Sequence, residues 1–482
     1  MKRYSYICLA IGIALAVGCV PERVVWSPDG SRAIVLGDDG MHLCDVSGRL
    51  SGPTAPNASS AEWMPDGKRV VASMMINLNT WDDVSKAFPQ DASEAVKNID
   101  AVRAELLTFK DQWANFIDNT AKKLGLPRGQ LLIALFKLGQ DEGKSLRLKL
   151  SQQMGDNLLN PQLNEFVVQV FVAGESQLTP GEVLYRKMQA QGDNGKIVAL
   201  RLSPTGTMVA LTLDQSGFSN GHPNELMVFS TDASGKSCDL GMAAAYPDWS
   251  VDGKYVVYVR PANWHPDDKD LLPGALTRRR VVDDKGALFE TEHLPDVQDL
   301  AGLAFDGWAR VRVARDGRIF FSATELTLPV TVPDVPTQGT IFYFDPERSA
   351  TLTRAVPRGA ADTVGNSPNY FELSPDARYV SIPFGDGRVS VLDIVEGDAQ
   401  LVQPVAEGNG KDLKLQSVPV WRTATELTFI RPTADLQRHE IVRYSVTDKS
   451  ATTFSAGWPS GTFDILTKPL EPATQPSAPG AK

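Results

Sequence analysis

The sequence predicts an all-β fold, a β-propeller of seven blades, with an α-helical insertion in its second blade. A short turn motif recurs along most of the 482 residues, and an apolar, β-rich run follows each copy within a few residues. Such a repeat must be recognised before any other feature, because it decides the architecture. After the second copy, the apolar residues change from strand-like to helix-like spacing, which predicts the insertion.

The clearest copy of the motif is Trp26-Ser27-Pro28-Asp29-Gly30. Proline fixes φ at the first turn position, aspartate hydrogen-bonds its own backbone, and glycine accepts the left-handed conformation that closes a hairpin. The large residue before each turn, here called the anchor, can pack against a neighbouring sheet. The seven anchors are Trp26, Trp63, Leu202, Trp249, Val313, Leu373 and Trp421.

The spacing of the anchors favours a ring. A blade of four strands with its turns needs roughly 40–50 residues, and most intervals between anchors hold one blade. The interval from Trp63 to Leu202 is much longer, so it holds a blade and an insertion. One small sheet cannot bury both faces alone, so the repeats must stack, and radial stacking gives a propeller over residues 19–466.

The motif resembles the WD40-like propeller repeat of TolB-type periplasmic proteins, whose signature is W-S-P-D-G followed by an apolar strand. The resemblance covers most of residues 22–460. The first, second and fourth copies match best, and the fifth and seventh depart from the pattern. Members of that class range from scaffold proteins to propellers fused to hydrolases, so the resemblance implies the fold rather than an activity.

The N-terminus predicts export. Residues 1–18 read as a signal peptide, in which two basic residues precede a short apolar stretch, Ile7–Val17. The segment Leu15-Ala16-Val17-Gly18-Cys19 resembles a bacterial lipobox, which implies lipid attachment at Cys19. We therefore expect a periplasm-facing protein of the bacterial cell envelope, held at the membrane by lipid; the alternative is a secreted soluble protein.

Residues 81–163 are expected to form the helical insertion. Asp91 and Glu94 fit a capping box. From Ile99 to Thr120, apolar residues then recur at three- and four-residue steps, which predicts one long helix.

Two further helices are expected in the same insertion. Gly125 ends the first helix, Pro127 opens a second, and a third covers roughly residues 142–154. Consecutive strands of a blade alternate in direction, so the loop between its second and third strands leaves from the face where its first strand begins. We therefore expect the insertion and Cys19 to lie on the same face of the ring.

The rest of the chain adds few functional signals. Residues 467–482 are rich in Pro, Ala, Thr and Ser and are expected to be disordered. Cys44 and Cys238 fall in different blades, which favours two separate buried thiols over a disulfide. The net charge of −10 argues against a nucleic-acid partner, because phosphate binding requires a basic face.

Two segments contain residue types that can form a catalytic or metal site. Gly217-Phe218-Ser219-Asn220-Gly221 matches the nucleophile-elbow string, but that elbow needs a strand-to-helix turn, and a polar hairpin loop fits this position better. In the loop 261–273, His265 lies close to Asp267, Asp268 and Asp270, yet the spacing matches no defined cation loop. The sequence therefore predicts no catalytic, cofactor or metal site.

Two functions fit this pattern. The first is a non-enzymatic, lipid-anchored scaffold that binds an envelope protein or peptide, because loops on a stiff frame are where binding residues collect. The second is an enzyme, or a sensor of a small ligand or carbohydrate, that uses the central channel or the 261–273 loop. A channel lined by convergent charged side chains with perturbed pKa values would favour the second function, and a channel filled by apolar side chains would favour the first.

Overall fold

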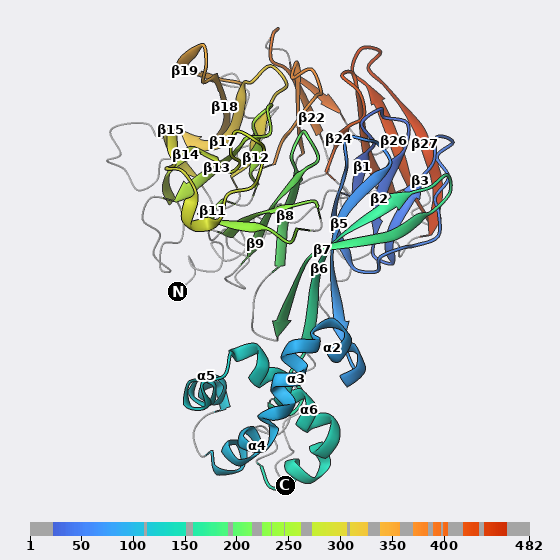
Figure 1. Ribbon diagram of the computed structural model, residues 1–482. Coiled ribbons are helices and arrows are strands. Elements are labelled where there is room, and N and C mark those ends of the chain that lie inside the picture. The colour runs from blue at the N-terminus through green and yellow to red at the C-terminus, as the bar shows by residue number, and fades with distance from the viewer. Residues whose placement is uncertain are drawn as a thin grey trace, which may run out of the picture.

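Every anchor lies where the first strand of a sheet ends and a tight turn to the second strand begins. The computed structural model describes residues 23–109, 113–150, 158–190, 196–214, 224–232, 234–244, 246–261, 272–305, 309–325, 338–356, 370–383, 389–396, 399–402, 418–432 and 438–459. Over these residues the chain is a seven-bladed β-propeller (Figure 1). The predicted fold class and blade count are therefore correct.

The blades follow one another along the chain, and their strands pair antiparallel. Blade one has three strands and the others have four; blades four and five join through one pair, Ala304 with Thr324. Blades one to three comprise β1 (Val24–Trp26), β2 (Ala33–Gly37), β3 (Gly40–Cys44); β4 (Ala58–Trp63), β5 (Arg69–Leu78), β6 (Leu163–Ala173), β7 (Leu178–Ala190); β8 (Lys196–Leu202), β9 (Met208–Asp214), β10 (Asn224–Ser230) and β11 (Ser237–Ala243).

The remaining four blades follow the same order. They comprise β12 (Asp248–Trp249), β13 (Tyr255–Pro261), β14 (Leu272–Arg280), β15 (Gln298–Phe305); β16 (Val311–Val313), β17 (Ile319–Glu325), β18 (Gln338–Asp345), β19 (Ser349–Arg354); β20 (Glu372–Leu373), β21 (Tyr379–Pro383), β22 (Val389–Asp393), β23 (Ala399–Val402); β24 (Val420–Trp421), β25 (Glu426–Pro432), β26 (Arg438–Ser445) and β27 (Ser450–Pro459). First strands of neighbouring blades contact one another, so they form the inner wall of the ring.

The motif makes the turns that the residue types predict. Ser27 Oγ accepts a hydrogen bond from the backbone N–H of Arg32, and Gly30 adopts a φ of 67°. The Asp29 carboxylate accepts from Ser27 Oγ at 2.6 Å and from the N–H and Oγ of Ser31. These bonds lower the pKa of Asp29 to about 2, so the carboxylate stays charged and holds the turn at neutral pH.

The core of the ring lies between blades rather than within them. Among the described residues, each pair of neighbouring blades shares its own cluster of buried apolar side chains. Between blades one and seven, for example, Val24 and Trp26 pack with Ile430 and Ile441. Burial between blades explains why one repeat cannot fold alone and why the ring must close.

Among the strands that the structure describes, none is exchanged where the ring closes, since β1–β3 pair only in blade one and β24–β27 only in blade seven. Side chains and turns make this joint instead. Trp26 Nε1 donates to Thr428 Oγ1 at 2.8 Å, and Arg422 Nε donates to the carbonyl of Gly30 at 2.7 Å.

The two faces of the ring differ. One, here called the turn face, carries the anchor turns: Arg32 of the first turn donates to the carbonyls of Gly67 and Gly174, which belong to two turns of blade two. The opposite face, here called the module face, carries the helices (Figure 1). Arg23, the first described residue, lies at the module face, because it bonds Leu36 and Asp38 where β2 ends.

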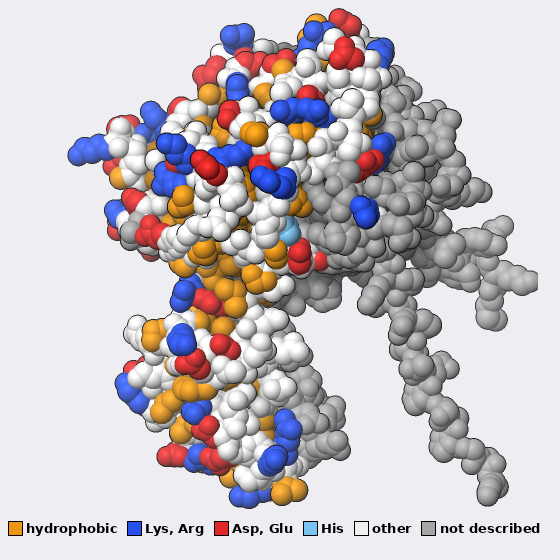
Figure 2. Space-filling view, turned by 90° about the vertical axis from the view of Figure 1, so that its right-hand side faces the viewer, with side chains coloured by type: hydrophobic (Ala, Val, Ile, Leu, Met, Phe, Trp, Pro, Cys, Tyr) orange, Lys and Arg blue, Asp and Glu red, His pale blue; other side chains and the backbone are white. Residues whose placement is uncertain are grey.

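All the α-helices among the described residues lie between β5 and β6. They are α2 (Trp81–Ala87), α3 (Pro89–Lys97), α4 (Ile99–Thr108), α5 (Trp113–Leu124) and α6 (Arg128–Arg147), here called the helical module. The module has its own apolar core, to which the strands contribute Leu78, Leu163 and Met188. Hydrophobic side chains also gather where it joins the ring (Figure 2).

Three details of the helix prediction are wrong. The capping box is formed by Thr80 and Asp83 at α2, whereas α3 starts at Pro89 without a side-chain cap, so Asp91 and Glu94 do not make one. The expected long helix is three helices, α3 to α5. The regular spacing of apolar residues in this segment reflects their burial, since Val102, Leu106 and Phe116 all lie in the module core.

The third error concerns α6, which runs through the expected break before residue 142 as one helix. Gly139 does not end it. Instead, a Cβ at this position would lie 1.7 Å from the carbonyl oxygen of Leu159, so glycine permits a close approach of backbone to helix. Residues 151–157, in the rest of the expected third helix, lie outside the described residues.

The two described cysteines behave as the sequence predicts. Cys44 and Cys238 are buried and unpaired with each other. Burial raises the pKa of each thiol to about 12. Among the described residues, no helix is both long enough and apolar enough to cross a bilayer.

Candidate functional site

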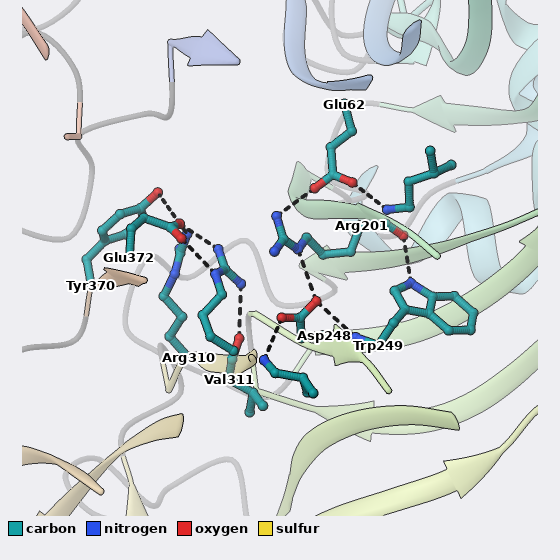
Figure 3. Close-up of polar contacts among 11 residues, drawn as sticks. Glu62, Arg201, Asp248, Trp249, Arg310, Val311, Tyr370 and Glu372 are labelled. Carbon is teal, nitrogen blue, oxygen red and sulfur yellow. Dashed lines mark hydrogen bonds and ion pairs between the residues drawn. The ribbon is translucent and has the colours of Figure 1, made fainter. Parts of the chain in front are cut away.

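The residue immediately before each anchor lies on the first strand of its blade, and these first strands form the inner wall of the ring. In chain order these residues are Val25, Glu62, Arg201, Asp248, Arg312, Glu372 and Val420. From blade two to blade six their charges alternate in sign, and valines occupy blades one and seven. These charged residues and Arg310 are here called the charge ring, and Figure 3 shows contacts that they make between neighbouring blades.

Glu62 joins blade two to blade three. One of its carboxylate oxygens lies 2.7 Å from Arg201 Nη1, and the other accepts from the backbone N–H of Leu202 at 2.5 Å. Both partners sit at the end of β8, so one carboxylate fixes the position of that strand end.

Asp248 continues the contacts into blade five. Its Oδ1 lies 3.5 Å from Arg201 Nε and accepts from the N–H of Trp249 at 2.9 Å. Its Oδ2 accepts from the N–H of Val313, also at 2.9 Å. A single carboxylate therefore contacts the innermost strands of three consecutive blades (Figure 3).

Glu372 holds the strongest pairing. Arg312 donates to both of its oxygens, at 2.9 Å from Nε and 2.7 Å from Nη2, and Arg310 donates to Oε1 as well. Burial alone would raise the pKa of Glu372, but the charges of Arg310 and Arg312 outweigh it and hold that pKa well below its usual range. Bidentate arginine–carboxylate geometry is the most favourable form of such a pair.

Arg310 is almost completely buried, with 1% of its side chain exposed. Its guanidinium lies 3.7 Å from the ring centroid of Tyr370 and 4.7 Å from that of Tyr246. Tyr370 also approaches Glu372 with its hydroxyl, at 3.4 Å. The aromatic faces and the carboxylate together offset the cost of burying this cation.

The tryptophan anchors supply the complementary contacts. The indole N–H of Trp63 donates to the carbonyl of Val25, that of Trp249 to Arg201, and that of Trp421 to Glu372. In each case the acceptor is the residue before the anchor of the preceding blade. Blades three, five and six have aliphatic anchors instead, and these blades meet the preceding one through Glu62, Asp248 and Glu372.

The charge ring can therefore lock blades together, and its chemistry is largely internal. Its three arginines, Arg201, Arg310 and Arg312, balance its three carboxylates, and each described carboxylate is within hydrogen-bonding distance of a neighbouring blade. Removing one partner from a buried pair leaves an uncompensated charge, which is strongly destabilising. This ring was not predicted from the sequence. The available signal was the alternation of sign one residue before each anchor.

None of the candidate residues that the sequence singled out belongs to the charge ring. Cys19, the Gly217–Gly221 string and His265 with its neighbouring aspartates fall outside the described residues. The strand ends that flank the last two segments can be placed: β9 and β13 end on the module face, because each starts at an anchor turn. Among the described residues, no group of three or more His, Cys, Asp or Glu lies close enough to hold a metal ion.

Comparison with known proteins finds similarity to solved structures only. No protein-family model matches the chain, and no curated protein matches it. Solved structures do. Puromycin hydrolase is 15% identical with a TM-score of 0.37, over 62% of this chain and 44% of that one.

Two other solved structures are similar over different shares of the chain. A putative TolB from Agrobacterium tumefaciens is 15% identical over 59% of this chain and 87% of that one, with a TM-score of 0.32. An oligogalacturonate lyase in complex with manganese is 10% identical over 92% and 91%, with a TM-score of 0.42. The likeness is one of fold. This chain spans less than half the length of puromycin hydrolase, and no activity follows from the comparison.

Proposed function

We propose that this chain is a non-enzymatic scaffold of the bacterial cell envelope, anchored by lipid at Cys19, that binds a periplasmic protein or peptide on its module face. The observation that supports this most is the internal pairing of the charge ring. Charged side chains do converge on the inner wall, which on the sequence alone favoured an enzyme or sensor. They are engaged with one another, however, as expected for a lock between blades rather than a reactive centre.

The alternative is a propeller enzyme, or a sensor of a small ligand or carbohydrate, acting in the channel or the 261–273 loop. A general acid or base needs a pKa near the working pH. Pairing with arginine moves the pKa of Glu372 away from neutral pH, because it holds that pKa well below its usual range. The contacts of the inner wall thus favour a role in holding the blades together, and they make an enzyme or sensor that acts in the channel the less favoured function.

The module face is the better candidate for a binding surface. In every four-stranded blade, the second strand ends on that face, so the connections to the third strands all start there. In blade two this connection contains the helical module, and we propose that residues 81–163 are an insertion that enlarges the binding surface. Function concentrates in such loops when a rigid frame positions them.

A module-deletion variant tests the proposal. Leu78 of β5 and Leu163 of β6 are paired neighbours, so an Asn-Gly turn can replace residues 79–162 without separating the strands. Full-length and module-deleted chains would be purified from membranes after a photo-crosslinker is placed at Val96, on α3, or at Val395, on the turn face; both side chains are exposed.

We expect the full-length chain to crosslink one defined envelope protein from the module face and none from Val395. Recovery of the same partner without the module would show that the ring alone binds it. If neither form retains a partner while either one converts a small substrate, the scaffold proposal is wrong.

A further inference from the structure

If the ring lay parallel to the membrane, the helical module would not fit between the ring and a bilayer that a short lipid tether holds close. Only three residues lie between Cys19 and Arg23, which lies at the module face, so the four residue steps of this tether reach at most about 14 Å. An anchor of that length would draw the module face toward the bilayer. The module projects from this same face (Figure 1).

The strands that carry the module extend from the module face by more than the length of this tether. Arg23 lies three residues before anchor Trp26, and the equivalent residue before Trp63 is Ser60, which pairs with Ser73 of β5. From Ser73, β5 continues five residues to Leu78, about 17 Å at the usual rise of a strand. The whole module lies beyond that point.

With the ring parallel to the membrane, the module would therefore enter the hydrocarbon. Its surface carries charged side chains such as Lys86, Lys97 and Lys122, and burying such charges in a bilayer is costly. A tilt of the ring that brings the bilayer surface against both the anchor and the far end of the module avoids this cost.

The far end of the module is reached by the C-terminal part of α6. Lys137 of this helix lies over the ring of Trp81 in α2, next to the strands, whereas Glu142 pairs with Arg103 of α4. Figure 1 shows α2 near the ring and α4 at the opposite end of the module. Gln140 still donates to the carbonyl of Asn79 at the end of β5, so the part of α6 from Glu142 to Arg147 is the part that extends along α4 past the strand end.

This end has the composition of a membrane contact. Leu148 is 89% exposed, and it is flanked by Lys144, Arg147 and Lys149, all exposed. We call these four residues the distal edge. Figure 2 shows hydrophobic and basic side chains at the end of the module farthest from the ring. On a chain of net charge −10, a basic edge with an exposed leucine is complementary to anionic lipid headgroups.

We infer that the distal edge rests on the bilayer, so that the lipid at Cys19 and the tip of the module are two contacts that set the tilt of the ring. The inference rests on the proposed lipid anchor. It assigns the distal edge to anionic phospholipid, and leaves the rest of the module face for the protein partner.

The test uses the lipidated full-length chain with Leu148→Cys labelled by an environment-sensitive dye. The thiols of Cys44 and Cys238 are buried, so the new cysteine reacts selectively. The matched control is Val251→Cys, an exposed apolar position on the turn face. Each protein is reconstituted into vesicles of phosphatidylethanolamine and phosphatidylglycerol, and emission and quenching by a lipid-borne spin label are recorded.

We expect a several-fold rise in emission and strong quenching at position 148, none at position 251, and loss of the effect in Lys144→Glu/Lys149→Glu. If position 148 behaves like position 251 in a protein that mass spectrometry shows to be lipidated, the inference is wrong and the anchor stands. If Cys19 carries no lipid, the anchor proposal fails, and the inference fails with it.

Discussion

Arg312 of blade five and Glu372 of blade six form a bidentate pair, with Nη2 and Nε of the arginine 2.7 and 2.9 Å from the two carboxylate oxygens. Among the described strands, β16 and β20, which carry these two residues, pair only within their own blades. The contact shows how this ring gains cohesion at blades whose anchors are aliphatic.

Glu372→Gln should therefore destabilise the fold severely. The change leaves Arg310 and Arg312 buried without their carboxylate, and breaking a buried pair in this way costs about 3–5 kcal/mol. Urea unfolding followed by tryptophan fluorescence measures the difference. The control is Glu396→Gln, whose carboxylate is 66% exposed and pairs with Arg378 on the surface; a loss of similar size in both variants would contradict a special role for Glu372.

The same carboxylate gives a pH dependence with a definite sign. Its pKa is depressed in the folded state, so its contribution to stability is complete above the unfolded-state pKa of about 4.3 and is lost as the pH falls below it. The stability gap between the wild-type chain and Glu372→Gln should thus narrow on acidification from pH 7 to pH 3. A gap that stays constant over this range would exclude the ionised pair as its cause.

The joint between blades one and seven can be tested by a double-mutant cycle. Trp26→Phe removes the indole donor to Thr428 but keeps an aromatic ring, and should cost about 1 kcal/mol. Thr428→Val removes the acceptor and its own bond to the carbonyl of Val420. The double variant should lose less than the sum of the two. Strict additivity would mean that the bond contributes nothing.

Two glycines at equivalent turn positions separate backbone strain from crowding between blades. Gly67 and Gly206 have φ values of 63° and 72°. A Cβ on Gly67 would meet nothing within 4 Å, whereas one on Gly206 would lie 2.6 Å from Cδ of Pro65 in blade two. Gly67→Ala should cost about 1–2 kcal/mol for the left-handed backbone, and Gly206→Ala clearly more. Equal melting temperatures would show that the turns are not in firm contact.

Thiol reactivity checks the burial of the two cysteines. With pKa values of about 12, Cys44 and Cys238 carry roughly one thiolate in ten thousand at pH 8. With Cys8 and Cys19 replaced by serine, the native chain should react with a maleimide only after guanidinium is added, and then at two sites. Rapid modification of the native protein would contradict the packing of β3 or β11.

The sequence predicted the ring because its anchors combine two independent requirements, a turn that needs Pro, Asp and Gly and a large residue that packs on the next blade. Both requirements can be recognised from a few adjacent residues, so the predicted number of blades was correct even where a copy of the motif departs from the pattern, as at Val313. Buried apolar residues in the helices were also recognisable, since burial imposes its own spacing.

The divisions within the helical module and the charge ring could not be predicted in the same way. Whether the chain breaks between α3 and α4 depends on how the helices pack on α6, which spacing alone does not encode. Pairing of Glu62 with Arg201 depends on two residues far apart in sequence that meet only when the blades are in register. Once the anchors are aligned, the alternation of sign becomes readable, but only because the ring is already known.

The way this ring closes also determines how it would respond to a mechanical load. Within the described part of the chain, blade one is held to blade seven by individual side chains such as Trp26 and by the contact of Arg422 with Gly30, and β1–β3 share no ladder with β24–β27. A pull on the N-terminal end would therefore peel blade one away contact by contact, at low force, instead of shearing many backbone hydrogen bonds at once.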